Sequence, residues 1–479
     1  MLQSNKTIEK VAVIGLDCAE PSLVFERWRD ILPNLSRLAD AGCYGNLTST
    51  IPPITVPAWT AMMTSQDPGQ LGIYGFRNRK DHSYDGLYFA NANFVKARTV
   101  WNHLSVKRKN SILLGVPQTY PPRPLRGIMV ASFLTPGKEA EFTYPKDIKQ
   151  ELDVIADGDY VIDVKDFRTD AKERLLEQIY DMTRKRFKVA REFVKRKPWD
   201  FFMMVEMGTD RIHHGFWRYS DPEHRLYEPG SRYEHVIRDY YVYLDSEIGR
   251  LVDELPPKTG VMVVSDHGAK GMKGAICVNE WLIREGLLTL KSRPDTVQKM
   301  TMDMIDWDKT VAWGEGGYYA RIFMNVKGRE PNGVVEQEQY EAVRDDLISR
   351  FEAICDEQGS PIGTRVFKPE QIYREVRNVP PDLIVYFGNL NWRSAGSVGV
   401  DSIHLFENDT GPDDANHAQE GMYILSFPGV QPEEYRNWQG RRMDGASLYD
   451  VAPTILDLFS ITVPPAMIGR TLREKFSGR

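Results

Sequence analysis

Short runs of consecutive hydrophobic residues alternate along this chain with longer segments in which hydrophobic positions recur every three to four residues. The short runs are typical of strands buried on both faces of a sheet, and the longer segments are typical of helices with one face in the core. The expected strands are 11–17, 111–116, 199–205, 260–264, 382–387 and 422–427, and the expected helices are 21–29, 32–41, 58–64, 100–104, 170–195, 240–255, 336–353 and 448–459. This alternation predicts an α/β fold with a mostly parallel central sheet and helices on both faces.

Two segments, 134–166 and 271–324, interrupt that pattern and have no clear period of their own. A chain of 479 residues is long enough for one large α/β domain that carries insertions. We therefore expect a single domain over 8–475, in which the two irregular segments are insertions that form a cap over its site.

The overall charge and the cysteines narrow the class of protein. The chain holds 61 Lys and Arg against 67 Asp and Glu, and its net charge of −6 argues against binding a nucleic-acid polymer through a basic surface. Its four cysteines form no Cys-x-x-Cys motif, which favours free thiols in a reducing compartment. No hydrophobic run approaches the ~20 residues that span a bilayer, and no signal-peptide pattern precedes the first strand. We expect a cytoplasmic protein without a membrane span.

Acidic and imidazole side chains follow two of the expected strands. Asp17 ends the first strand, and Asp266 and His267 come shortly after the hydrophobic run 260–264. Open α/β sheets keep their sites at the carboxyl ends of their strands, and carboxylate with imidazole is a ligand combination that suits Zn or Mn. Each of these residues alone is also compatible with a helix cap or a polar turn, so the pattern depends on further ligands elsewhere in the chain.

Two further places supply such ligands. Asp210 and His214 are four residues apart, which puts them on one face of a helix, whereas His213 lies off that face and is expected to contact substrate or a ligand side chain. His417 lies in a polar segment before the strand 422–427. Together with the first group, the chain offers three carboxylates and three imidazoles, which is enough for two metal ions about 3.5–4 Å apart, the geometry that serves phosphoryl displacement.

Thr55 is the candidate nucleophile. It stands at the start of an expected helix, with Pro57 in the first turn, where the missing N–H of proline costs nothing. A threonine hydroxyl is a poor nucleophile until a metal ion or a base activates it. Taken by itself, Thr55 is more often a simple helix cap; the metal-type ligands elsewhere in the chain make the nucleophile the stronger interpretation.

The order of these residues resembles the alkaline phosphatase superfamily, and within it the type I phosphodiesterase and nucleotide pyrophosphatase branch. That branch carries a strand-end Asp, a Thr-x-Pro, an Asp-x-x-x-His, an Asp-His-Gly and a late His in this order. The matching residues here are Asp17, Thr55-Val56-Pro57, Asp210 with His214, Asp266-His267-Gly268 and His417, and the closing run 449–456 is also similar. The resemblance implies an alkaline-phosphatase-like three-layer sandwich.

The resemblance also implies a role for each residue. One metal ion would be held by Asp17, Asp266 and His267, with Thr55 bound to it as the nucleophile. The other ion would be held by Asp210, His214 and His417. Zn is usual in this branch and Mn serves elsewhere in the superfamily, so both remain open. A phospho-threonine intermediate would form on Thr55 and then be hydrolysed.

The sequence departs from the branch after the nucleophile helix. Where nucleotide pyrophosphatases place an Asn that contacts the phosphoryl oxygen, this chain has Phe76, followed by Arg77, Asn78 and Arg79. An Arg fork suits phosphate, so these three residues are the candidates for binding substrate. The segment is more similar to a subgroup of predicted phosphohydrolases and phosphomutases.

We therefore expect an enzyme that acts on small phosphoesters, most simply a phosphodiesterase. A phosphomonoesterase or a phosphomutase or phosphotransferase on the same fold are the alternatives, and a non-catalytic binding protein is a third class. Bound metal with turnover of a diester, a monoester or an acceptor-dependent transfer would separate them. The sequence leaves the physiological substrate and the oligomeric state open.

Overall fold

A ten-stranded sheet forms the centre of the larger part of the molecule. The computed structural model describes residues 8–407, 409–430 and 432–476. Across the sheet the strands run β22 (Arg441–Arg442), β2 (Gly42–Thr48), β21 (Glu420–Ser426), β9 (Thr259–Val264), β1 (Lys10–Leu16), β8 (Phe201–Glu206), β5 (Ser111–Val116), β6 (Gly127–Ala131) and β7 (Thr143–Tyr144), and β23 (Ala446–Ser447) also pairs with β2. The five strands from β9 to β6 are parallel. Every residue of β5, β8 and β9 is buried, which is why their sequences are continuously hydrophobic.

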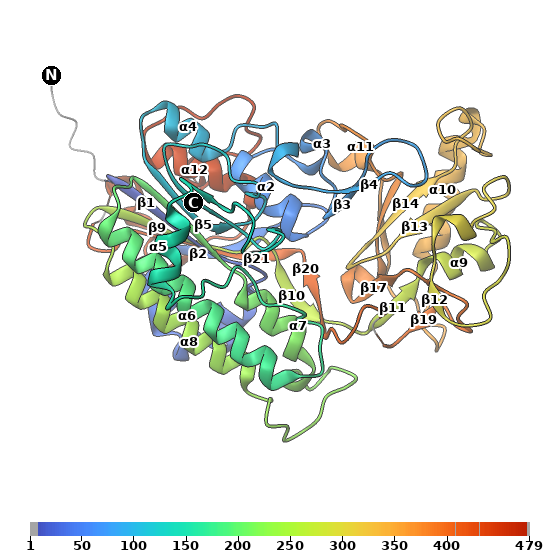
Figure 1. Cartoon of the computed structure of the whole chain (residues 1–479), viewed down its shortest axis with the longest axis horizontal. Helices are drawn as coiled ribbons and strands as arrows, with labels where there is room; N and C mark the ends of the chain where they lie inside the picture. The colour runs from blue at the N-terminus through green and yellow to red at the C-terminus, as the bar shows by residue number, and fades with distance from the viewer. Residues whose placement is uncertain (1–7, 408, 431, 477–479) are drawn as a thin grey trace.

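Helices cover both faces of this sheet. One face carries α1 (Pro33–Asp40), α6 (Lys172–Arg196), α7 (Gly208–Ser220) and α8 (Val236–Asp253), which pack on one another (Figure 1). The other carries α2 (Thr55–Thr64), α4 (Val100–Val106) and α12 (Val451–Leu458), with α3 (Pro68–Leu71) next to α2 and α13 (Leu472–Phe476) next to α12. The expected α/β sandwich with a mostly parallel central sheet is confirmed.

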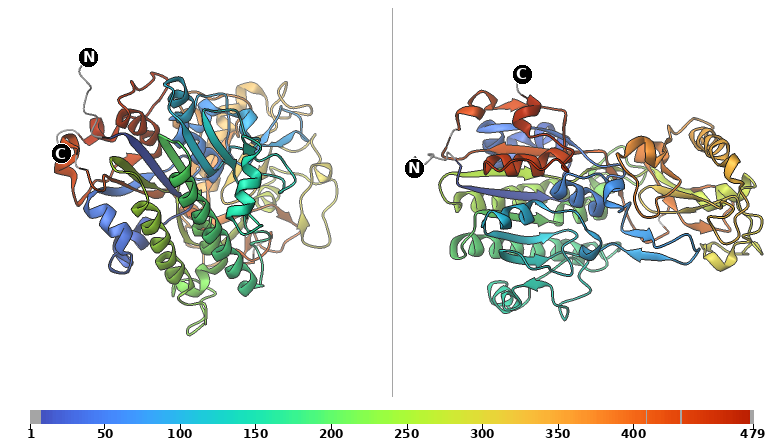
Figure 2. Two further views of the ribbon diagram at one scale, coloured as in Figure 1. Left: turned by 60° about the vertical axis from the view of Figure 1, so that its left-hand side comes forward. Right: turned by 90° about the horizontal axis from the view of Figure 1, so that it is seen from above.

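A second, smaller lobe stands beside the sandwich (Figure 2). It is built from residues 272–407 and 409–412 around a four-stranded antiparallel sheet, β13-β14-β16-β15, and has a hydrophobic cluster of its own. Its elements are β11 (Gly274–Cys277), α9 (Val278–Arg284), β12 (Gln298–Lys299), β13 (Ala312–Glu315), β14 (Ala320–Met324), α10 (Tyr340–Glu352), β15 (Arg365–Phe367), α11 (Pro369–Ile372), β16 (Leu383–Tyr386), β17 (Trp392–Ala395), β18 (Ser397–Val398) and β19 (His404–Leu405).

The lobe is larger than the insertion expected at 271–324. The helix expected at 336–353 and the strand expected at 382–387 both form, but as α10 and β16 of the lobe, and β16 pairs antiparallel to its neighbours. Their hydrophobic residues are buried in the cluster of the lobe, and a hydrophobic pattern does not reveal which core it joins. The other irregular segment, 134–166, lies at the edge of the main sheet, where α5 (Ile148–Ile155) packs against α6.

Two elements, the strand β2 and the hairpin of β3 (Arg77–Arg79) and β4 (Leu87–Phe89), were not predicted by the hydrophobic pattern. The strand β2 contains Gly42, and a Cβ there would come within 1.9 Å of the Leu425 carbonyl oxygen, so the close strand pairing needs glycine. The hairpin of β3 and β4 extends from the sandwich toward the lobe (Figure 1). Among the helices of the described residues, none combines the length and the hydrophobicity that crossing a membrane requires.

Candidate functional site

The strand β1 lies at the centre of the site because its two neighbours in the sheet, β9 and β8, run parallel to it. Parallel strands end at the same edge of a sheet. Asp17 follows β1, Asp266 follows β9, and β8 leads directly into α7, which carries Asp210. All three carboxylates are at most 3% exposed. The topology therefore gathers, at one edge, acidic residues that are up to 249 positions apart in the chain.

Asp17, Asp266 and His267 form the first group of potential ligands. One ligand atom from each lies within 4.8 Å of the others. His267 Nε2 is 3.1 Å from Asp266 Oδ2 and 3.9 Å from Asp17 Oδ1. Burial raises the pKa of both carboxyl groups well above its usual range, and the charge of nearby carboxylates adds to the effect. A bound cation would offset both causes.

Thr55 lies against this group. It is the first residue of α2, a helix whose ten residues are all buried, so its position is fixed by packing. Thr55 Oγ1 is 3.5 Å from Asp17 Oδ1 and 3.5 Å from His267 Nε2. The indole of Trp59, one turn further along α2, donates to Asp17 Oδ2 at 2.7 Å and holds that carboxylate in place.

Asp210, His214 and His417 form the second group. The four-residue spacing on α7 brings His214 Nε2 to 3.2 Å from Asp210 Oδ1. The strand β10 (Gly268–Gly271) begins directly after His267, and β20 (Ala415–Ala418) pairs with it. This pairing places the ring of His417 3.8 Å from the ring of His267 and nearly parallel to it. His417 Nε2 is 3.9 Å from Asp210 Oδ1. The two groups are thus adjacent, with the stacked histidines between them.

The three imidazoles share one orientation. In each, Nδ1 faces an oxygen: the Gly268 carbonyl at 3.1 Å for His267, the Pro53 carbonyl at 2.8 Å for His417, and Asp413 Oδ1 at 2.6 Å for His214. A carbonyl only accepts, so Nδ1 of His267 and His417 carries the hydrogen and Nε2 keeps a free lone pair.

This orientation fits metal ions. His417 Nε2 is buried and, among the described residues, has no hydrogen-bond partner. Burial lowers the pKa of His267 to about 4 and that of His417 well below its usual value, so both rings stay neutral, as ligands must. Burial also opposes the charged form of His214, but Asp413 and Asp210 outweigh it and raise its pKa to about 9.

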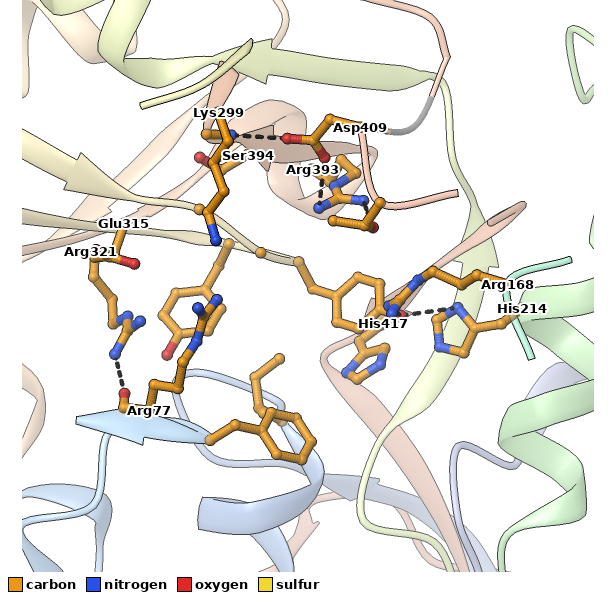
Figure 3. A pocket seen from close by; sticks show the side chains of 18 of the residues that line it. Arg77, Arg168, His214, Lys299, Glu315, Arg321, Arg393, Ser394, Asp409 and His417 are labelled. Carbon is orange, nitrogen blue, oxygen red and sulfur yellow. Dashed lines mark hydrogen bonds and ion pairs between the residues drawn. The ribbon is translucent and has the colours of Figure 1, made fainter. Parts of the chain in front are cut away.

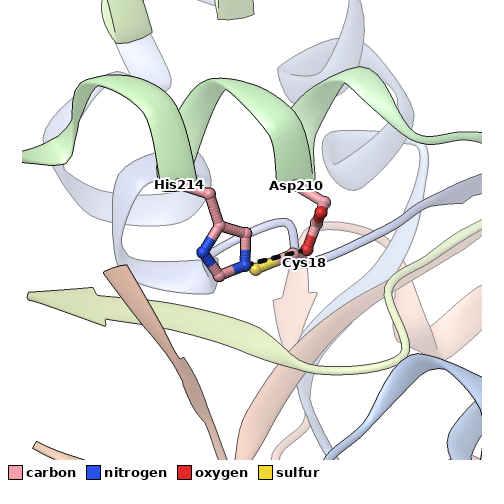
Figure 4. A group of neighbouring side chains, drawn as sticks. All are labelled: Cys18, Asp210 and His214. Atoms are coloured by element: carbon pink, nitrogen blue, oxygen red, sulfur yellow. Dashed lines mark ion pairs between the residues drawn. The ribbon is translucent and has the colours of Figure 1, made fainter. Parts of the chain in front are cut away.

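Cys18 is a competitor for the second group. Its Sγ lies within 4.8 Å of ligand atoms of Asp210 and His214 (Figure 4). The thiol donates to the Gly268 carbonyl at 3.4 Å, and burial together with the charge of Asp210 raises its pKa well above the usual range. A thiol that keeps its proton is a poor metal ligand. The geometry therefore favours His417, with its free Nε2, over Cys18.

A hydrogen-bond network behind His214 contains residues that the sequence did not single out. Asp413 accepts from His214, from the Tyr318 hydroxyl at 2.9 Å and from Arg168 Nε at 2.8 Å. The ring of Tyr318 also stacks on His417, 4.3 Å between centroids. The one sequence signal was the position of Asp413 in the polar segment that leads to His417. Arg168 lies shortly before α6 and Tyr318 lies in the lobe, and no local pattern connects either residue to the site.

A cavity of about 740 Å³ lies between the sandwich and the lobe (Figure 3). Thr55, Asp210, His214 and His417 line its inner end. Its outer wall comes from the lobe and from the β3 hairpin and includes Arg77, Lys299, Glu315, Tyr319, Arg321, Arg393 and Ser394. The candidate ligands thus open directly into a space large enough for a small-molecule substrate.

Of the four residues expected to bind substrate, Arg77 lines this cavity. Asn78 instead accepts from the Tyr74 amide at 2.8 Å and donates to the Gly75 carbonyl at 2.9 Å, so it stabilises a turn. Arg79 is buried in the lobe and paired with Glu330 at 3.2 Å. His213 is also buried and contacts the Tyr241 hydroxyl at 3.2 Å. These three side chains face away from the cavity because turn formation and packing, which residue type does not reveal, determine their direction.

Comparisons with known proteins agree with the fold. The family model described as type I phosphodiesterase / nucleotide pyrophosphatase matches residues 11–413. The fold is similar to that of human ectonucleotide pyrophosphatase / phosphodiesterase 5, with a TM-score of 0.54 and 13% identity over 95% of this chain and 96% of that chain. It is also similar to phosphonoacetate hydrolase from Sinorhizobium meliloti 1021 in complex with phosphonoacetate, with a TM-score of 0.57 and 14% identity over 90% and 94%. No curated protein sequence matches.

Proposed function

This chain belongs to the type I phosphodiesterase / nucleotide pyrophosphatase family, and we propose that it is a two-metal-dependent phosphodiesterase in which Thr55 attacks phosphorus. The observation that carries the proposal is the position of Thr55 Oγ1, 3.5 Å from both Asp17 and His267 at the inner end of the cavity. A hydroxyl beside a potential metal group and open to a substrate cavity has the geometry of an activated nucleophile.

The proposed ligands divide as the two groups do. One ion would be held by Asp17, Thr55, Asp266 and His267, and the other by Asp210, His214 and His417. Three imidazoles with three carboxylates favour Zn, with Mn as the alternative. When bound, the two ions would lower the pKa of the Thr55 hydroxyl and neutralise charge on the phosphoryl oxygens.

In the proposed reaction, Thr55 attacks from a position that the buried helix α2 fixes. Asp17 Oδ1 is 3.5 Å from Thr55 Oγ1, and its carboxylate has lone pairs left to take the proton, whereas Nε2 of His267 would be occupied by the ion. As the bond between Oγ1 and phosphorus forms, the bond from phosphorus to the leaving oxygen breaks, and the phosphoryl group is left on Thr55 as an ester that water then hydrolyses. The N-terminus of α2 directs its dipole toward this position and favours the negative phosphoryl oxygens.

The experiment compares two substrates with the metal-loaded protein. Bis-p-nitrophenyl phosphate and p-nitrophenyl phosphate are assayed with added Zn or Mn, and the diester is expected to turn over with the higher kcat/KM. Faster turnover of the monoester would indicate a phosphomonoesterase instead of a phosphodiesterase. Products that depend on an added alcohol would indicate a phosphotransferase. Metal-loaded protein that cleaves no phosphoryl ester would overturn the proposal.

A further inference from the structure

The wall of the cavity opposite the candidate metal ligands is cationic. Arg77 comes from β3, Lys299 from β12 and Arg321 from β14, and all three line the cavity. We call these three residues the cationic wall. Figure 3 shows the side chains of Arg77 and Lys299 pointing toward one another across the cavity, with Arg321 beside them.

Arg321 is the most informative of the three. The residue is 6% exposed, yet among the described residues no carboxylate forms an ion pair with it. It donates to the backbone carbonyl of Arg77, which neutralises no charge. The carboxylate of Glu315 lies across from it in the register of β13 and β14 without an ion pair. A buried guanidinium without an ion pair is costly, so an anionic ligand would complete this position.

Arg77 and Lys299 extend this positive field into the cavity. In the described part of the chain, neither side chain has an ion pair or a hydrogen-bond acceptor of its own, and Lys299 lies exposed at the rim. Glu315 is the one carboxylate close to them on the wall, since Asp409 is 3.3 Å from Arg393. Three cations against one carboxylate leave an excess of two positive charges. A compact anion with several oxygens matches two guanidinium groups and an ammonium.

The two ends of the cavity therefore differ in what they attract. The inner end would take the phosphoryl group that Thr55 attacks. We propose that the cationic wall binds a second anionic group of the same substrate, a phosphate or a carboxylate on the part of the molecule that does not react. This inference rests on the proposed function, and it names the substrate class: a phosphodiester with an anionic substituent.

The test uses p-nitrophenyl phosphodiesters that differ in the second ester group: ethyl, choline, carboxymethyl, and 2-phosphoethyl. Wild-type protein is expected to show kcat/KM values for the two anionic esters about tenfold to a hundredfold above the ethyl ester, the range of a charge-assisted hydrogen bond. The choline ester is expected to be the poorest. The ratio between the phosphate and the carboxylate ester identifies which anion the wall prefers.

Variants locate the effect. In Arg77→Gln and in Arg321→Gln, the ratio of anionic to ethyl ester is expected to fall toward one. Lys80→Gln, which removes an exposed positive charge from the same hairpin, is the matched control and should keep the wild-type ratio. Because a ratio is measured, a general loss of activity through local misfolding does not imitate the result. Equal kcat/KM for all four esters in the wild type, or a preference that survives in both arginine variants, would overturn the inference while the phosphodiesterase stands.

A binding measurement separates the two proposals. Sulfate is titrated calorimetrically into the metal-loaded protein, the two arginine variants and Lys80→Gln. If no ester is cleaved but sulfate binding weakens about tenfold or more in Arg77→Gln and not in Lys80→Gln, the cationic wall is supported and the proposed function fails. Sulfate that does not bind, or that binds equally to all variants, would overturn the cationic wall.

Discussion

The two walls of the cavity are built in different ways. The inner wall stands on the ends of long parallel strands, and its carboxylates and imidazoles are almost completely buried. The cationic wall stands on short strands of the lobe and on a three-residue strand of the β3 hairpin, and its side chains range from buried to exposed. The inner wall is therefore held rigidly by the core, whereas the outer wall depends on a smaller structure packed beside it.

This difference fits two separate roles, in which the inner wall holds the reacting groups and the outer wall recognises the rest of the substrate. Reacting groups must be held within fractions of an ångström, which a buried parallel sheet provides. Recognition of the part of a substrate that does not react tolerates more variation and is commonly carried by loops and insertions. One segment connects the two walls: Asp409 contacts Arg393 of the lobe, and Asp413 holds His214 of the inner wall. Changes in the lobe can therefore reach the candidate metal ligands through residues 409–413.

The largest effect is expected at Thr55, the proposed nucleophile of the inner wall. It tests whether the reaction takes place at the inner wall. Thr55→Ala should lower kcat for the diester by about a thousandfold or more, since the attacking oxygen is lost. Bound metal, measured by elemental analysis, should stay nearly unchanged because the carboxylates and imidazoles remain. Thr55→Ser is the control that keeps a hydroxyl. An alanine variant that turns over at the wild-type rate would remove Thr55 from the mechanism.

The next effect concerns stability and distinguishes two arginines of the same hairpin. Arg79→Met should lower the free energy of unfolding by roughly 2–3 kcal/mol, less than the usual cost of breaking a buried pair because Arg329 still contacts Glu330 at 2.8 Å. Arg77→Met, which breaks no ion pair, should cost less than about 1 kcal/mol. Chemical denaturation measures both. Equal losses would mean that Arg77 is structural rather than available to a ligand.

Asp413 tests the link between the walls. Asp413→Asn should weaken binding of the proposed second ion by about 10- to 100-fold, because the carboxylate orients His214 through its Nδ1. Zn titration against a competing chelator measures the affinity. Asp414→Asn is the matched control, since the Asp414 carboxylate contacts Arg218 at 2.7 Å and not the histidine. The same loss in both variants would point to a general disturbance of the segment.

The smallest effect is expected at the rim. Lys299 is exposed, and an exposed charge contributes little because water screens it. Lys299→Gln should lower kcat/KM for the anionic esters by about two- to fivefold, less than Arg77→Gln does. The same ester assay gives the value. A larger loss at Lys299 than at Arg77 would mean that the anion sits nearer to the rim than the buried Arg321 implies.

Much of the inner wall could be predicted from the sequence. The strands β1 and β9 are continuously hydrophobic because both of their faces are covered, and the acids that follow them therefore mark the edge of the sheet. The spacing of Asp210 and His214 is a property of one helix. The order of the candidate ligands and Thr55 along the chain resembles that of a known family. The fold that this resemblance implied is confirmed by the family model and the similar structures.

The cationic wall and the network behind His214 could not be predicted in this way. Arg77, Asn78 and Arg79 are consecutive, yet one lines the cavity, one stabilises a turn and one is buried in the lobe. Residue type gave no reason to separate them. The strand at 382–387 was expected from its hydrophobicity, but the sheet that it joins depends on contacts with β14, about sixty residues away.

The sequence by itself determined the buried strands, the helices on both faces and the candidate ligands at the strand ends, because each follows from local periodicity or from a residue next to it. Only the tertiary structure decided that Asp413 and Tyr318 support the histidines and that Arg321 is buried without an ion pair among the described residues. It also showed that Asn78 and Arg79 face away from the cavity. The physical reason is that burial and pairing between distant segments depend on packing, and packing sets the direction of a side chain without leaving a period in the sequence.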